Sequence, residues 1–285
     1  MRISVLASGS KGNCVYIEGN SGALLIDTGR SAREILGTRN QKGRLHEAGG
    51  SSDLVDGILV THEHVDHIRG LGPIGNNLKK PAYGTVGTMD AFLRKQTSAN
   101  RFPVHAIRCR SPFEVGGFSV EAFPVSHDAT EPCGFLICEG STRLCYCTDT
   151  GVVTTGMQEM LCQADGLILE SNHCTEMLRT GSYPEYLKRR IASHRGHLSN
   201  TDAATVLRDL GDSLHLAILA HLSEENNEPD LAMITAQEGL SLHAESVEIF
   251  AASSIDLTEK PPIRKLRGKR RESCTDDCWR YRFDL

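Results

Sequence analysis

The sequence contains no run of 18 apolar residues, so it predicts no transmembrane helix. Its first apolar stretch, Ile3 to Ala7, is short and runs into Gly9 and Lys11. This pattern favours a first strand over a signal peptide. We also find no internal repeat of fixed period. These absences predict a cytoplasmic protein without a membrane partner, and a length of 285 residues allows one large or two modest domains.

A disulfide framework is also absent. The ten cysteines are spread over the whole chain without regular spacing, which favours reduced, mostly buried thiols. Cys145 and Cys147 flank Tyr146 in a predicted strand and point to the same face. A buried strand face is the favoured interpretation of that pair, and a soft metal pair is the alternative. Cys274 and Cys278 could clip the C-terminal tail, but a zinc site there would need ligands from elsewhere.

Charge is unevenly distributed. Residues 259–285 carry 9 Lys and Arg against 5 Asp and Glu, whereas the rest of the chain has a net charge of −9. We therefore divide the chain into a main domain, 1–257, and a basic C-terminal tail, 258–285, which Pro261 and Pro262 make irregular. A basic tail on an acidic body suits a polyanionic partner, although charge alone slightly favours a solvated tail without one.

Apolar runs bounded by Gly, Asp or Pro predict strands at 3–7, 14–18, 23–27, 57–61, 104–108, 118–123, 133–138, 143–148, 166–170, 215–219 and 247–251. Helices are expected near 32–36, 68–78, 86–96, 154–162, 185–195, 200–210 and 229–238. The segment 37–53 looks like a surface loop. This order of elements predicts two sheets with helices outside them.

The segment His-Glu-His-Val-Asp-His, residues 62–67, follows a predicted strand directly. Imidazole and carboxylate at this density are what divalent metals need. His62 and His64 are two apart in an extended turn, so both can reach one ion, whereas Asp66 and His67 should point toward a second one. Glu63 should face solvent or the backbone. A helical zinc motif would place two histidines four positions apart on one face, whereas His62 and His64 are two apart, so this segment does not match that motif.

Further candidate ligands stand where later strands end. His127, Asp149 and His221 each follow a predicted strand, in that order along the chain. A single histidine in such a place is usually a surface residue. Three such residues behind the 62–67 segment favour one dinuclear site.

The order HxHxDH, His, Asp, His resembles the metallo-β-lactamase fold superfamily, whose α/β fold is a four-layer αββα sandwich. Further segments narrow the resemblance to YycJ/WalJ-type exonucleases, which are related to ribonuclease Z-like phosphodiesterases: Leu6 to Asn13, Val125 to Asp128, Glu170 to His173, Tyr183-Pro184 with Leu187 to Arg190, Gly196 to Asn200, and Ala220 to Ser223 with Glu225 to Asn227. The match extends to about residue 255, and the tail departs from the pattern.

The resemblance implies a ligand set. His62, His64 and His127 would hold one metal, Asp66, His67 and His221 a second, and Asp149 would bridge both, with Asp27 bracing the loop from outside. Nitrogen and oxygen ligands suit zinc, manganese or iron, and we expect two divalent ions, zinc or manganese. Asp149 stands where β-lactamases of this fold have Cys, and His64 where oxygen-reducing relatives have Glu. Lactam hydrolysis and di-iron redox chemistry are therefore disfavoured.

Two divalent ions, two ligand carboxylates and a bridging hydroxide leave the centre positive, which suits an anionic phosphodiester. We expect Asp66 and His197 to be catalytic, with His197 touching the phosphate or leaving oxygen by analogy with ribonuclease Z; a surface histidine near a helix cap is the alternative. Glu170 and His173 would organise the site. Substrate contacts are expected from Lys188 and Arg195, seven apart on one predicted helix, and from Ser8, Ser10, Asn13 and Ser199. For the glycine-rich segment 8–13 a plain turn is the alternative.

The sequence thus predicts a metal-dependent phosphodiesterase. The family resemblance further implies a 5′-to-3′ exonuclease that acts on DNA. Only 72 positions separate Asp149 from His221, which leaves no room for the inserted nucleic-acid clamp of ribonuclease J-like relatives. The alternative is a hydrolase of small thioesters, lactones or cyclic phosphodiesters on the same scaffold. A non-catalytic module that binds nucleic acid through its tail is a third, weaker hypothesis. Metal identity, DNA over RNA, cleavage polarity and oligomeric state are not determined by the residues themselves.

Overall fold

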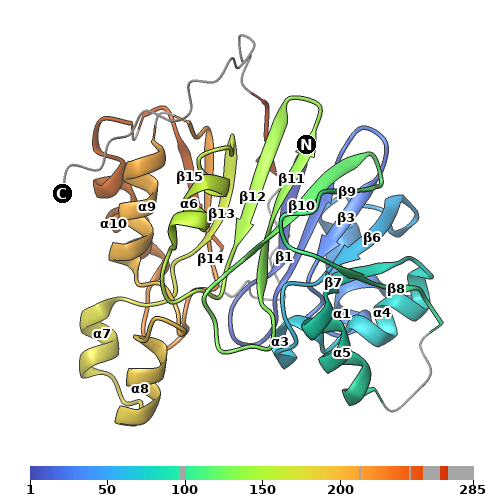
Figure 1. The fold of residues 1–285 in the computed structure, drawn as a ribbon, viewed down its shortest axis with the longest axis horizontal. Helices are drawn as coiled ribbons and strands as arrows, with labels where there is room; N and C mark the ends of the chain where they lie inside the picture. Colours follow the sequence, from blue (N-terminus) through green and yellow to red (C-terminus); the bar gives the residue numbers. More distant parts are fainter. Residues whose placement is uncertain (97–100, 212, 244, 253–263, 269–285) are drawn as a thin grey trace.

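Two seven-stranded sheets lie face to face, with helices on their outer surfaces (Figure 1). The computed structural model describes residues 1–96, 101–211, 213–243, 245–252 and 264–268. The first sheet has the order β16-β1-β2-β3-β6-β7-β8 and the second β15-β14-β13-β12-β11-β10-β9. This arrangement of helix, sheet, sheet and helix confirms the predicted fold class.

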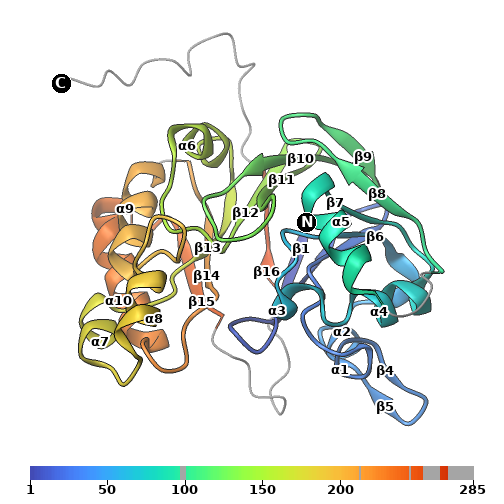
Figure 2. The same cartoon turned by 60° about the horizontal axis from the view of Figure 1, so that its bottom comes forward.

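The strands of the first sheet are β1 Arg2–Ala7, β2 Cys14–Glu18, β3 Ala23–Ile26, β6 Val55–Leu59, β7 Ala82–Thr85, β8 Val104–Ile107 and β16 Arg264–Lys265. Those of the second are β9 Phe113–Val115, β10 Phe118–Pro124, β11 Cys133–Glu139, β12 Thr142–Cys147, β13 Gly166–Glu170, β14 Leu216–Ala220 and β15 Glu248–Ala251. A small hairpin, β4 Gly37–Thr38 and β5 Gln41–Lys42, stands apart from both sheets (Figure 2).

Each sheet is antiparallel on one side and parallel on the other. Strands β3, β6, β7 and β8 run parallel in the first sheet, and β12, β13, β14 and β15 in the second. The strand β14, which lies next to the edge strand β15, is Leu-Ala-Ile-Leu-Ala and buried along its whole length, as expected for a parallel strand covered on both faces. In parallel sheets, ligand sites form beyond the carboxyl ends of the strands.

The helices are α1 Ala32–Leu36, α2 Arg44–Glu47, α3 Val65–Ile68, α4 Leu71–Leu78, α5 Val86–Lys95, α6 Thr155–Leu161, α7 Thr175–Thr180, α8 Glu185–Ile191, α9 Asn200–Leu210 and α10 Pro229–Leu240, with short 3-10 turns at Ser52–Leu54 and Ser241–His243. The helix α9 begins with a capping box, because the hydroxyl of Ser199 accepts from the N–H of Asp202 and the Asp202 carboxylate accepts from the N–H of Ser199.

The apolar core has three parts. One lies between the sheets and includes Ile17, Phe118 and Tyr146. The second packs α6, α9 and α10 against the second sheet, and the third packs α1, α4 and α5 against the first sheet. Cys145 and Cys147 are fully buried in the second part, which confirms the predicted buried strand face.

The structure differs from the sequence-based expectations in two segments. The expected loop 37–53 contains the β4–β5 hairpin and α2, and Leu45 is fully buried against the third part of the core. The expected irregular tail contains β16, which pairs with β1, and Leu266 beside it packs between the sheets. Neither feature could be predicted from the sequence, because both segments are polar or contain prolines. A single buried apolar residue in such a segment gives no recognisable helix or strand pattern. Cys274 and Cys278 lie outside the described residues.

Two helical expectations also need correction. The helix expected at 68–78 is two helices, α3 and α4, with Gly70 between them; a side chain at Gly70 would meet the carbonyl oxygens of Arg30 and Thr28. The helix expected to reach 195 ends at Ile191, so Lys188 and Arg195 do not share a helix face. Neither α7 nor β9 was predicted.

Candidate metal centre

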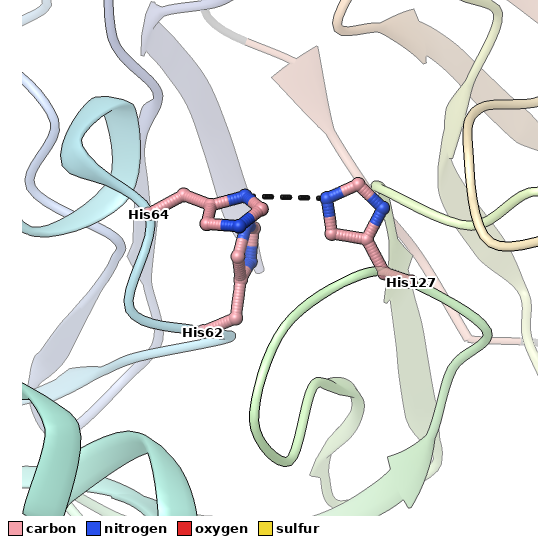
Figure 3. Close-up of side chains that lie close together, drawn as sticks. All are labelled: His62, His64 and His127. Carbon is pink, nitrogen blue, oxygen red and sulfur yellow. Dashed lines mark hydrogen bonds between the residues drawn. The ribbon is translucent and has the colours of Figure 1, made fainter. Parts of the chain in front are cut away.

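The predicted metal ligands meet between the carboxyl ends of the two sheets. The segment 62–67 follows β6 and runs into α3, whereas His127 follows β10, Asp149 follows β12 and His221 follows β14. Figure 3 shows the rings of His62 and His64, from one loop, facing that of His127 from another. The Nδ1 of His64 lies 3.3 Å from the Nε2 of His127. Two sheets thus contribute to one cluster.

The ligand atoms form overlapping groups. The residues His62, His64 and His127 offer atoms within 4.8 Å of one another, and so do three further sets: Asp66, His67 and His221; His62, His67 and Asp149; and Asp149, Glu170, His197 and His221. The first two sets are the two predicted metal sites. The third links them through Asp149, so the rings of His62 and His67 belong to one centre instead of pointing apart.

Several buried atoms of this cluster fit a cation. The Nε2 atoms of His62 and His221 and the Oδ2 of Asp149 are buried without a hydrogen-bond partner among the described residues. A buried polar atom left unpaired is costly, and buried polar groups in proteins are usually hydrogen-bonded or coordinate a metal. Imidazole nitrogens and carboxylate oxygens facing one another are the donor set of zinc and related divalent ions. The residues present therefore fit a dinuclear metal centre.

The second nitrogen of each deeply buried ring is held by a neighbour. The Nδ1 of His67 lies 2.8 Å from Oδ2 of Asp27, and Asp27 also accepts from the N–H and the hydroxyl of Thr61. The Nδ1 of His127 lies 3.0 Å from the carbonyl oxygen of Gly196. These contacts assign the Nδ1 proton and leave each Nε2 lone pair facing the cluster, an arrangement typical of metal-binding histidines.

Glu170 organises the other side of the centre. Its Oε1 lies 2.8 Å from Nδ1 of His221 and 2.7 Å from Nδ1 of His197, while its Oε2 accepts from the N–H groups of Thr150 and Leu198. The carboxylate is fully buried, and four donors satisfy it. Glu170 therefore orients the rings of His197 and His221 at once. The Nε2 of His197 points away from Glu170, and His197 is more exposed than His221.

The electrostatics of the cluster favour ionised acids. Burial alone would raise the pKa of Asp66 and Asp149, but the surrounding histidines lower both below the ordinary value. Burial, followed by the charge of His67, lowers the pKa of His62. Burial opposes a charge on His221, yet the carboxylates of Asp149, Asp66 and Glu170 raise its pKa to about 10. Metal binding here would displace a proton from that ring.

The expected substrate contacts near the N-terminus face inward instead. Ser8 is buried, and its hydroxyl accepts from the N–H of His221 at 2.7 Å. Asn13 is buried as well, and its Nδ2 lies 3.0 Å from Nε2 of His67. Both contact predicted metal ligands, and the N–H of Asn13 also donates to the carbonyl oxygen of Asp66. Ser10 is exposed.

The other expected contacts are also engaged. The Nζ of Lys188 donates to the carbonyl oxygen of Arg179, Arg195 donates twice to the carbonyl oxygen of His127, and Ser199 caps α9. Arg195 thus holds the backbone of a metal ligand. His173 is buried, and its Nδ1 has no partner among the described residues, but its ring belongs to none of the ligand groups.

Sequence reasoning missed two residues at this site. Asp128 directly follows His127, and its Oδ1 lies 3.4 Å from Nε2 of His127, while its Oδ2 accepts from Nε of Arg190 at 2.6 Å. The only signal was adjacency to a ligand. Glu63 faces the backbone, which is one of the two expected environments, because its Oε1 accepts from the N–H and hydroxyl of Thr130; the sequence did not indicate that it is buried.

The fold and the site combine two facing sheets with a cluster of His and Asp residues that is able to hold metal. Residues 23–222 match the model of the beta-lactamase superfamily domain. The chain belongs to the beta-lactamase superfamily, whose members are hydrolytic, and it is an enzyme of this kind. In the part of the chain that the structure describes, no helix is long and apolar enough to span a bilayer.

Two curated relatives narrow the family. The chain is 37% identical to the exodeoxyribonuclease WalJ of Streptococcus pneumoniae over 240 residues, which is 82% of this chain and 86% of the relative. It is 37% identical to the exodeoxyribonuclease YycJ of Bacillus anthracis over 244 residues, 84% of this chain and 89% of the relative. These matches confirm the resemblance drawn from the sequence.

A solved structure shares the fold. The metallo-beta-lactamase fold protein YhfI from Bacillus subtilis superposes with a TM-score of 0.67, at 19% identity, over 93% of this chain and 99% of that one. At this identity the likeness supports the arrangement of sheets and helices alone.

Proposed function

We propose that this protein is a metal-dependent nuclease and, more narrowly, a 5′-to-3′ exonuclease acting on DNA. The observation that carries the proposal is the gathering of imidazoles and carboxylates from both sheets around buried, unpaired ligand atoms. The names of the relatives from S. pneumoniae and B. anthracis support DNA as the substrate.

In this proposal His62, His64 and His127 hold one ion, Asp66, His67 and His221 the other, and Asp149 lies between them. Bound divalent ions in such a pair lower the pKa of a water molecule and stabilise the attacking and leaving oxygens of a phosphodiester. Zinc or manganese suits these ligands. The protein's own contribution is to hold the ligands in place through Asp27, Glu170 and the carbonyl oxygen of Gly196.

His197 has the geometry of a proton donor. Its Nδ1–H donates to Glu170, and its ring lies 5.0 Å from that of His127 and 5.2 Å from that of His221, centre to centre. In the protonated form, its Nε2 would give a proton to the leaving oxygen, and Glu170 would stabilise the positive ring. Positioned general acids of this kind typically contribute about 10²–10⁴-fold to the rate.

A second candidate is a small-molecule hydrolase, favoured by the acidic body outside the tail, which has a net charge of −9. Long polyanions bind such a surface poorly. Strand ends or single strands, which place few phosphates on the protein, fit this charge better than long duplexes do.

The two candidates are separated with metal-loaded protein and end-labelled oligonucleotides. A 5′-to-3′ exonuclease releases the label from a 5′-labelled strand as a mononucleotide at once, and shortens a 3′-labelled strand progressively. DNA and RNA strands of one sequence test the sugar preference, and the His64→Ala variant controls for a contaminating nuclease. Cleavage of small esters or lactones without any cleavage of nucleic acid would overturn the proposal.

A further inference from the structure

We propose that Arg190 is a substrate-binding residue that contacts a phosphate of the bound strand beside the metal centre, held there by Asp128. This inference rests on the proposed function and names one cation of this chain for the substrate. It replaces Lys188 and Arg195, the cations that the sequence suggested.

The position of Asp128 carries the first step. Its Oδ1 is buried, lies 3.4 Å from Nε2 of His127 and 3.9 Å from Nε2 of His64, and has no hydrogen-bond partner among the described residues. The Nδ1 of His64 faces the Nε2 of His127 and the cluster, so its Nε2 is the nitrogen left for an outer partner. Asp128 is thus a carboxylate close to the rings of both His64 and His127, although it forms no hydrogen bond to either ring, unlike Asp27 at His67.

The second step is the anchoring of Arg190. Its Nε donates to Oδ2 of Asp128 at 2.6 Å, and 54% of its side chain is exposed. Within the described ranges, its Nη groups form no hydrogen bond, so these donors remain for another ligand. The hydrogen bond to Asp128, together with the charges of Asp128 and Asp66, raises the pKa of Arg190. A planar guanidinium held by one edge suits bidentate contact with phosphate.

The third step is that neighbouring cations are already used. Lys188 pairs with Glu185 and donates to the backbone carbonyl oxygen of Arg179. Arg195 donates to the backbone carbonyl oxygen of His127. On the other side of the cluster, Lys11 pairs with Glu224. Arg190 is therefore the cation of α8 that combines a fixed position beside two metal ligands with unused donors.

The experiment compares Arg190→Ala and Asp128→Asn with wild type and with Arg179→Ala as matched control. Arg179 is an exposed arginine of α7, paired with Glu176 and outside the ligand cluster. Metal content is measured by elemental analysis, and binding of a single-stranded DNA oligonucleotide to metal-loaded protein is measured at several salt concentrations, together with kcat and KM.

For Arg190→Ala we expect unchanged metal content, binding weakened by about 10-fold or more, as for a charge-assisted hydrogen bond, and a salt-dependence slope reduced by about 0.7, as for one lost phosphate contact on a single strand. Asp128→Asn should show the same loss and also bind metal about 10- to 100-fold more weakly, because a neutral amide replaces the carboxylate close to His64 and His127. Arg179→Ala should match wild type. An Arg190→Ala protein with the affinity and slope of Arg179→Ala would overturn the inference, whereas wild-type protein that binds no nucleic acid would overturn the proposed function itself.

Discussion

Three residues of the site adopt the left-handed backbone conformation. Asp27, Asp149 and His221 have φ values of 57°, 56° and 56°, although none is glycine. Each follows the end of a strand, where the turn directs its side chain into the cluster. Such a conformation costs about 1–3 kcal/mol for each residue and persists only where surrounding contacts enforce it. Backbone strain therefore coincides with two predicted metal ligands, Asp149 and His221, and with Asp27, which holds the ring of His67.

Substitution of single ligands gives the first prediction. We expect His64→Ala and Asp149→Asn each to lose metal and to abolish turnover, because both residues face the cluster with atoms that no other group can replace. Elemental analysis and a nuclease assay measure the two effects. Full activity with normal metal content in either variant would contradict the ligand assignment.

The role of His197 gives the second prediction. His197→Ala should keep its metal, because the ring is the more exposed edge of the cluster, yet its rate should fall by about 10²–10⁴-fold. Elemental analysis beside kcat separates this outcome from that of a ligand. Loss of metal in this variant would make His197 a ligand, as its membership in one ligand group allows.

At the scale of elements, the segment 62–67, which carries four of the predicted ligands, is fixed by a close backbone approach. The N–H of Asn13 donates to the carbonyl oxygen of Asp66, and the Cβ of any side chain at Gly29 would lie 1.6 Å from that same oxygen. Only glycine fits there. The turn after β3 thereby contacts the backbone of the 62–67 segment closely and fixes the direction of its side chains.

The strand β16 gives the third prediction. Leu266 follows it and is 3% exposed, packed between the sheets. Leu266→Ala should lower the free energy of unfolding by about 2–5 kcal/mol, as in other buried leucines. Leu93→Ala is the control, because that side chain is 45% exposed on α5. Denaturant unfolding measures both, and equal stabilities would show that β16 adds little to the fold.

At the scale of the whole molecule, the metal centre joins the two sheets. Its ligands come from loops of both, so bound metal should stabilise the folded protein by about 2.7 kcal/mol at a free metal concentration of 100 times Kd. Chelation should therefore abolish cleavage and lower Tm, and re-addition of zinc or manganese should restore both. The His197→Ala variant should show the same shift in Tm. Activity that survives exhaustive chelation would contradict the proposed chemistry.

Much of this architecture followed from the sequence because it depends on local pattern. Apolar runs predicted most strands, and ligand-type residues at strand ends predicted a cluster, because the carboxyl ends of parallel strands meet at one edge. Two elements with a weak apolar pattern were not predicted: β16 in a basic, proline-containing segment, and α2 in a polar loop.

The outer contacts of the site depended on tertiary structure. Ser8 was expected to contact phosphate, but its hydroxyl oxygen accepts from the backbone N–H of His221, 213 positions away. Glu170 serves two rings at once, and Arg190 meets Asp128 from a helix that lies 62 positions further along the chain. The sequence by itself determined which chemical groups exist and in what order strands deliver them. Only the packing of the two sheets decided which of those groups face the cluster and which form hydrogen bonds that hold other groups in place. The reason is that contacts between distant segments leave no periodic signal in the chain.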